Sequence, residues 1–198
     1  MLKELLQNKE FVRIVNNILL QQGVLDVILF GSVVRGKYQP KDIDILILFS
    51  FKEDIEVEFS LRKSLENVGK HFHVIGISYE KMFDASFVAR EDVFSDGYSF
   101  RKKEFLSSAF GYACFYLFKY SLKGKTDSEK MRFHYGLYGR GGEKGVLFLF
   151  NAVKFGNLSI ICPLEKSDSM TEFFEKWKLD FERIKILIPK QMIKRIFE

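Results

Sequence analysis

The chain has 198 residues, of which 47% are hydrophobic and 29% are charged. This composition excludes a disordered chain and allows a sizeable buried core, in one domain or in two small ones. Two cysteines, Cys114 and Cys162, are too few for a disulfide framework or a zinc site, which favours a reducing, cytoplasmic location. Because no apolar run is long enough to span a bilayer and no signal peptide is apparent, we expect no membrane partner.

Charge is distributed unevenly along the chain. Residues 1–100 hold 12 Lys+Arg and 15 Asp+Glu, a net charge of −3, whereas residues 101–198 hold 19 and 11, a net charge of +8. An acidic part is suited to metal ions and a basic part to polyanions. We therefore predict an N-terminal domain over residues 1–103 and a basic C-terminal domain over residues 104–198.

The first hundred residues alternate between helical and strand patterns. Apolar spacing predicts helices over residues 2–22, 55–68 and 79–94, with a single helical turn at 32–35. Short runs rich in Ile, Leu and Val predict strands over residues 27–30, 43–49 and 72–78. The alternation predicts an α+β fold in which helices pack on a short mixed sheet.

The remaining residues predict a basic α/β extension. The apolar pattern favours a long helix over residues 104–122, with further helices over 128–138 and 170–179. Strands are expected over residues 158–162 and 181–188, while residues 146–153 fit either a helix or a strand. This half therefore has the elements of a second domain.

Two acids stand in an otherwise apolar run, DIDILIL, at Asp42 and Asp44. On a strand, residues i and i+2 point to the same face, so the two carboxylates would lie side by side. Their mutual repulsion is relieved if they share a divalent cation, and Mg²⁺ prefers such oxygen ligands together with substrate phosphates. The pair predicts a site for Mg²⁺ or Mn²⁺.

A phosphate cradle is predicted just before these acids, at Gly31 and Ser32. A glycine after a strand lets the backbone turn tightly and approach a ligand. A helical turn that begins at Ser32 would direct backbone N–H groups at a phosphate, and Arg35 would add positive charge. Arg35 could equally pair with a surface acid.

Together these motifs resemble the DNA polymerase β-like nucleotidyltransferase superfamily. Its pattern is an apolar strand, Gly-Ser, a short spacer and Asp-apolar-Asp, matched here by LFGS at residues 29–32 and DIDI at residues 42–45. Arg35-Gly36 matches the Arg-Gly of its small stand-alone members, the minimal nucleotidyltransferases. The resemblance covers residues 25–100 and implies a nucleotidyltransferase-like domain.

The resemblance also implies an activity. Metal ions held by Asp42 and Asp44 would serve transfer of a nucleoside monophosphate from a nucleoside triphosphate such as ATP to a hydroxyl. Gly31, Ser32 and Arg35 would bind the triphosphate. The alternatives are a catalytically silent nucleotide- or RNA-binding member, or a protein-modifying enzyme of the toxin–antitoxin type.

One feature departs from the family pattern. The family carries a third carboxylate on a later strand, and His73 stands at that position here. Imidazole is a poor ligand for Mg²⁺ but suits Mn²⁺ or Zn²⁺. Three other acids are candidate substitutes for this carboxylate, although none lies on the predicted strand: Glu56, Glu58 and Asp84. His73 itself is expected to be a partly buried structural residue.

The basic half indicates RNA as a partner. The segment 130–140, KMRFHYGLYGR, interleaves cations with aromatic rings, a mixture that suits phosphate contacts and base stacking. The alternative is an amphipathic helix with Phe133 and Leu137 in the core.

Overall fold

The computed structural model describes residues 2–37 and 39–197, and the chain divides into two compact units, Met1–Gly111 and Tyr112–Glu198. The division lies later than the boundary expected at 103/104, because β5 (Glu104–Phe105) pairs with β4 (Tyr98–Ser99) of the first unit. Helix α6 (Leu106–Ala109) follows directly within that unit. Across the described ranges, no helix is both long enough and apolar enough to cross a membrane.

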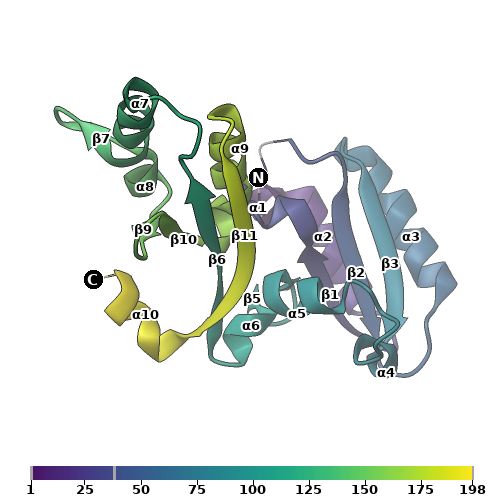
Figure 1. Ribbon diagram of the computed structural model, residues 1–198. Helices are drawn as coiled ribbons and strands as arrows, with labels where there is room; N and C mark the ends of the chain where they lie inside the picture. The colour runs from purple at the N-terminus through teal and green to yellow at the C-terminus, as the bar shows by residue number, and fades with distance from the viewer. Residues whose placement is uncertain (1, 38, 198) are drawn as a thin grey trace. The chain divides into compact units, whose positions relative to one another are not determined.

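The first unit is built on a mixed five-stranded sheet with the order β3-β2-β1-β4-β5 (Figure 1). Strands β2 (Ile43–Phe49) and β3 (Phe72–Ser78) are parallel, and β1 (Val24–Phe30) is antiparallel to β2 and β4. The mixed sheet with packed helices confirms the predicted fold class. Strands β2 and β3 have the predicted bounds, and β1 begins earlier than expected.

Alternation along β1 and β2 gives each face of the sheet its own core. Val27, Leu29 and the odd-numbered β2 residues pack with helices α2 (Lys9–Leu19) and α3 (Ile55–Leu65). Ile28, Leu46 and their neighbours form a second cluster with residues of α4 (Tyr79–Met82) and α5 (Arg90–Asp96). Because residue 44 has the parity of Leu46, Asp44 belongs to the α4–α5 face.

Two helices of the first unit are shorter than predicted. The helix expected over 2–22 is split into α1 (Leu2–Gln7) and α2, because the Asn8 side chain accepts a hydrogen bond from the Phe11 N–H at 3.0 Å and caps α2. The helix expected over 79–94 is split into α4 and α5. Helix α3 continues into a 3₁₀ turn, Glu66–Val68, which together match the predicted span 55–68.

The second unit contains a four-stranded antiparallel sheet with the order β11-β6-β10-β9. The long helix predicted over 104–122 is wrong, since β6 occupies Tyr112–Ser121. Aromatic residues dominate this run and favour strands, and the buried Phe118 alternates with the exposed Lys119. Strands β10 (Ser159–Pro163) and β11 (Asp180–Pro189) match the two strands predicted here.

Helices of the second unit enclose an aromatic core. Helix α7 (Asp127–Tyr138) begins with a capping box between Thr126 and Glu129, and α9 covers Ser167–Lys176. The segment 146–153, which fitted either a helix or a strand in the sequence, contains helix α8 (Val146–Leu149) and the start of β9 (Val153–Lys154). Helix α10 (Lys190–Phe197) was not predicted, and a hairpin joins β7 (Gly139–Arg140) to β8 (Glu143–Lys144). The core rings are those of Phe118, Tyr120, Phe133, Phe173, Phe174, Trp177 and Phe181.

Candidate functional site

Asp44 lies directly against the backbone of Gly31. The two strands that carry them are antiparallel, with Phe30 opposite Asp44, so the turn after β1 and the start of β2 are neighbours. Gly31 has φ +78°, and a Cβ built there would overlap Asp44 Oδ2. Glycine is thus required at residue 31 both for its left-handed conformation and for the carboxylate beside it.

The turn at Gly31 is a short 3₁₀ helix, Gly31–Val33, that follows β1. The Val34 and Arg35 N–H groups donate to the Gly31 carbonyl at 3.2 and 3.4 Å and close the turn. The N–H groups of its first residues have no acceptor within the turn, as at any helix start. The predicted phosphate-binding pair, Gly31 and Ser32, therefore lies next to the Asp44 carboxylate.

Asp42 immediately precedes β2 and is exposed, and the Asp44 side chain is 30% exposed. Strand pairing begins at Ile43, whose N–H donates to the His71 carbonyl at 2.9 Å. The two acids therefore flank a residue fixed in the core. Both carboxylates remain open to solvent.

His73 stands next to Asp44 across the parallel β2–β3 pair, in register with it. Its Nδ1 lies 3.3 Å from Asp44 Oδ1, and its side chain is 63% exposed, so the expectation of a partly buried residue is wrong. The register shows that residue 73 is the β3 position paired with Asp44. An imidazole therefore occupies the place where the family pattern has its third carboxylate.

The other acids considered for that role are placed elsewhere. Glu58 packs over Gly76, which shares its face of β3 with Val74 and not with His73, and it pairs with Arg62 at 3.4 Å. Asp84 accepts the Ser86 N–H at 2.7 Å, and this hydrogen bond lowers the pKa of its carboxyl. Glu56 is exposed on the first turn of α3. None of these three is positioned to replace the third carboxylate.

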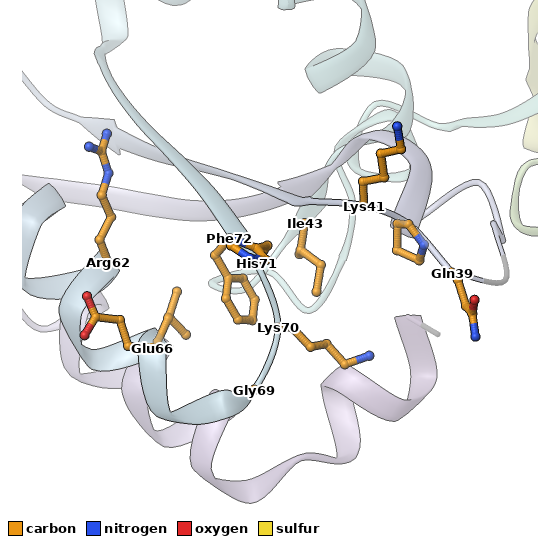
Figure 2. Close-up of a pocket in the computed structure, with 11 residues that line it drawn as sticks. Gln39, Lys41, Ile43, Arg62, Glu66, Gly69, Lys70, His71 and Phe72 are labelled. Atoms are coloured by element: carbon orange, nitrogen blue, oxygen red, sulfur yellow. The ribbon is translucent and has the colours of Figure 1, made fainter.

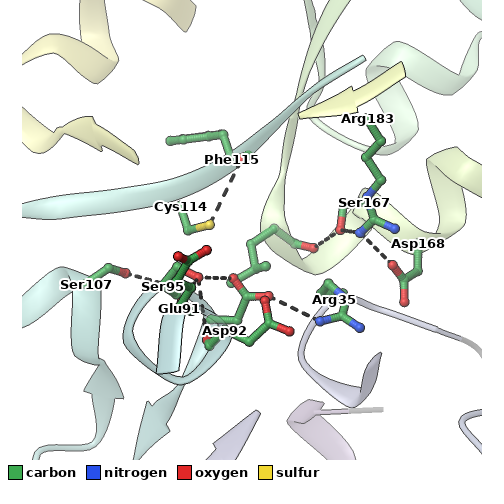
Figure 3. A network of polar contacts seen from close by, with 12 residues as sticks. Arg35, Glu91, Asp92, Ser95, Ser107, Cys114, Phe115, Ser167, Asp168 and Arg183 are labelled. Carbon is green, nitrogen blue, oxygen red and sulfur yellow. Dashed lines mark hydrogen bonds and ion pairs between the residues drawn. The ribbon is translucent and has the colours of Figure 1, made fainter. Parts of the chain in front are cut away.

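Arg35 is anchored by a buried acid that the sequence did not single out. Its Nη1 lies 3.3 Å from Oδ2 of Asp96, whose side chain is fully buried, and the Ser95 hydroxyl donates to Oδ1 of Asp96 at 2.9 Å (Figure 3). Asp96 precedes a glycine, so its sequence context indicated only a turn. The Arg35 guanidinium is thus held beside the Gly31 turn by the end of α5.

A cavity of about 700 Å³ opens on the opposite face of β2 and β3 (Figure 2). It is lined by Ile43, Leu65 and Phe72 together with basic residues such as Lys41 and Lys70, and not by Asp44 or His73. The cavity is therefore separate from the acidic site.

The acidic site fits a cation only when a ligand brings further oxygen atoms. Within residues 2–37 and 39–197, no group of three His, Cys, Asp or Glu side chains is arranged to hold a metal ion. Mg²⁺ is commonly held by one or two carboxylates and completes its shell with waters and substrate phosphates. Asp42 and Asp44 match that donor set, so the residues fit a metal that arrives with a nucleotide.

Comparison with protein families agrees with this geometry. Residues 13–93 match the family described as polymerase beta, nucleotidyltransferase. The match identifies this segment as a nucleotidyltransferase domain, and it includes the Gly31 turn, both acids and His73. No curated protein matches the chain.

Three solved structures are distantly similar to the chain. A variant of the MntA–HpeT toxin–antitoxin complex is 17% identical over 45% of this chain and 70% of that one, with a TM-score of 0.36. A tri-AMPylated Shewanella oneidensis HEPN toxin in complex with MNT antitoxin is 16% identical over 48% of this chain and 69% of that one, with a TM-score of 0.34. A toxin–antitoxin with AMP-PNP is 20% identical over 45% of this chain and 71% of that one, with a TM-score of 0.36. At these TM-scores the likeness says nothing about the chemistry of this chain.

The contact between Gly31 and Asp44 predicts that a methyl group added at residue 31 destabilises the fold. Gly31→Ala should lower the free energy of unfolding by about 3 kcal/mol, since it adds a steric clash to backbone strain. Gly69→Ala is the matched control, because Gly69 has φ +74° but nothing within 4 Å of an added Cβ. It should cost about 1 kcal/mol, from strain alone.

Urea unfolding of both variants measures the difference. Gly31→Ala should lose more stability than Gly69→Ala. Adding Asp44→Ala to Gly31→Ala should recover most of this additional loss, because the carboxylate that clashes is then absent. Equal losses for Gly31→Ala and Gly69→Ala would show that the carboxylate does not pack against the turn.

The Arg35–Asp96 pair predicts a second loss of stability. Arg35→Ala should lower the free energy of unfolding by about 3 kcal/mol, because it removes the guanidinium that pairs with the buried Asp96 carboxylate. The same change in an Asp96→Asn background should cost much less. Lys37→Ala, at an exposed position nearby, is the control and should change stability by less than about 0.5 kcal/mol. An equal cost of Arg35→Ala in the two backgrounds would contradict the pairing.

Proposed function

We propose that this protein transfers a nucleoside monophosphate from a nucleoside triphosphate to a hydroxyl group. The observation that carries the proposal is the placement of the Asp44 carboxylate against the Gly31 turn, within a segment that matches a nucleotidyltransferase family. Nucleotidyl transfer needs a phosphate cradle beside carboxylates that hold metal ions. Both parts meet where β1 ends and β2 begins.

In this proposal Asp42 and Asp44 hold Mg²⁺ or Mn²⁺ that enters with the triphosphate. When bound, the metal supplies charge stabilisation at the phosphate that is transferred. The backbone N–H groups of Gly31 and Ser32 bind phosphate oxygens, and Arg35 contributes a positively charged group that Asp96 holds in one orientation. The domain thus acts mainly by positioning and charge.

RNA is the proposed acceptor, with protein as its alternative. The second unit, residues 112–198, holds 16 Lys+Arg and 10 Asp+Glu, a net charge of +6 that favours a polyanion. The proposed location is the cytoplasm, because Cys114 and Cys162 are both free thiols in buried positions.

A second candidate function is nucleotide or RNA binding without transfer. The observation in its favour is His73, whose imidazole lies 3.3 Å from Asp44 where a third carboxylate would otherwise hold metal. An imidazole there brings no negative charge to offset the charge of a divalent cation. The two candidates differ in turnover and not in binding.

A label-transfer assay tests the first candidate. The protein is incubated with each α-³²P-labelled nucleoside triphosphate, Mg²⁺ or Mn²⁺, total RNA and cell extract. Label should appear on a macromolecule and should fall at least a hundredfold in Asp42→Ala or Asp44→Ala, and upon chelation of the metal, because charge stabilisation is lost. Lys52→Ala, at an exposed residue outside the site, is the control variant and should transfer label like the native chain. Unchanged transfer in both aspartate variants would rule out the mechanism, and the size of the labelled product separates RNA from protein.

The place of His73 predicts a change of metal preference. His73→Asp should raise the ratio of Mg²⁺-supported to Mn²⁺-supported transfer, because it adds an oxygen ligand beside Asp44. His73→Asn is the matched control, with similar size and no charge. If the native chain binds nucleotide without transfer, and transfer appears in His73→Asp, the silent-binding candidate is correct for the native chain. No change in the ratio would show that residue 73 does not reach the metal.

A further inference from the structure

A second cavity lies within residues 112–198 and has no part in the acidic site. Its volume is about 790 Å³, within the range of small-ligand sites. We name it the α7 cavity, and six of the residues that line it carry the argument: Tyr120, Lys130, His134, Tyr138, Lys154 and Leu158. They come from β6, α7, β9 and the loop before β10.

Aromatic rings form one wall of the α7 cavity. His134 and Tyr138 are four residues apart on α7, so they share a face of the helix, and their ring centroids are 4.4 Å apart at an interplanar angle of 33°. His134 is exposed and Tyr138 is 37% exposed, so the tilted pair of rings presents aromatic surface to solvent. Exposed rings of this kind offer a surface on which a further flat ring can pack.

Tyr120 lines the cavity with a ring that is anchored in the core and that carries a hydroxyl group. Its ring stacks on that of Phe174 at 5.3 Å, which ties it to the aromatic core of the unit. Burial, together with the nearby Tyr138 hydroxyl, raises the pKa of Tyr120 to about 12. The phenol is protonated at neutral pH, as an ordinary tyrosine is, and its hydrogen bond with the Tyr138 side chain joins this residue to the ring pair on α7.

Two lysines supply positive charge at the cavity. Lys154 on β9 is exposed, and Lys130 on α7 lies 3.0 Å from Asp127, which is fully exposed. An ion pair with such an exposed acid is weak and exchanges readily for another anion. The cavity thus combines rings with cations, and the unit around it carries a net charge of +6.

The remaining wall is held in a strained conformation. Leu158 has φ +53°, which is unusual for a bulky side chain, and its carbonyl accepts the Tyr120 N–H at 3.0 Å. Such strain persists only where the surrounding structure enforces it. The Leu158 side chain, 43% exposed, lines the same cavity as the rings of α7.

We infer that the α7 cavity binds an unpaired base of single-stranded RNA, with the adjoining phosphates on Lys154 and Lys130. Flat rings that stack on aromatic side chains next to cations are the usual chemistry of single-strand recognition. A base-paired strand cannot present its ring face to the His134 and Tyr138 rings, which excludes duplex RNA. The inference rests on the proposed function in one respect, that this RNA is the acceptor.

The test is binding of fluorescein-labelled oligouridylate and oligoadenylate to the full chain, followed by fluorescence anisotropy without nucleoside triphosphate. Tyr138→Ala and His134→Ala should each weaken binding about tenfold, in line with the loss of one base stack. Tyr138→Phe should bind like the native chain, because it keeps the ring. Lys154→Ala should weaken binding less and reduce its dependence on salt.

Phe148→Ala and Lys144→Ala are matched controls in the same unit. They remove an exposed ring and its cation, 3.8 Å from the ring centroid, from a pair outside the α7 cavity. Both should bind RNA within about twofold of the native chain, and circular dichroism confirms that each variant is folded. Equal losses for Tyr138→Ala and Phe148→Ala, equal affinity for duplex RNA, or no binding by the native chain would each overturn the inference.

The Asp42→Ala/Asp44→Ala double variant separates this inference from the proposed function. It should bind the oligonucleotides with unchanged affinity, since its changes lie in the other unit. If transfer is never observed but RNA binding depends on Tyr138, the proposed function fails and the binding site stands. If label is transferred to RNA equally well in Tyr138→Ala, the α7 cavity is not the acceptor site.

Discussion

The close approach of the Asp44 carboxylate to the Gly31 backbone is the constraint on which the candidate site depends. It requires β1 and β2 to be antiparallel neighbours in one register, so that Phe30 faces Asp44. It also requires a residue without a Cβ where the chain turns. A one-residue slip of β2 would move Asp44 to the face of the α2–α3 core and send the isoleucines to the α4–α5 face, at a large cost in packing and in desolvation of the carboxylate. The packing that stabilises the sheet therefore also positions the acid.

The two faces of this sheet differ: one carries most of the apolar core, and the other carries the candidate site. The face covered by α2 and α3 carries most of the buried apolar side chains, and its cavity is lined by Ile43 and Phe72. The face covered by α4 and α5 has a smaller core and carries Asp44, His73 and the Arg35–Asp96 pair. Polar groups gather where the apolar cluster is thinner, since hydrated carboxylates are costly to place within a dense core.

The sequence allowed β2 and β3 to be predicted because each signal there is local, whereas the metal site at Asp42 and Asp44 stays a prediction. The run at residues 43–49 is rich in Ile and Leu, contains no glycine or proline and is too short for a typical helix. Two features could not be predicted in this way. The partner of Arg35 is Asp96, distant in sequence, and such pairings depend on tertiary structure. The segment around Phe118 was assigned to a helix because its continuous apolar run hides the alternation that burial reveals.

The small hairpin β4–β5 with helix α6 has a consequence for how this chain is divided. Phe105 packs edge-on against Tyr98 at 5.7 Å, and the Ser107 hydroxyl donates to the buried Ser95 carbonyl at 3.0 Å. Ser95 neighbours Asp96, so this short segment supports the anchor of Arg35 from behind. A recombinant fragment that ended at residue 103 would lack it, whereas one that ended at residue 111 would keep the whole first unit. The same limit applies to any natural exchange of C-terminal parts on this domain, because the segment up to Gly111 would have to be inherited with it.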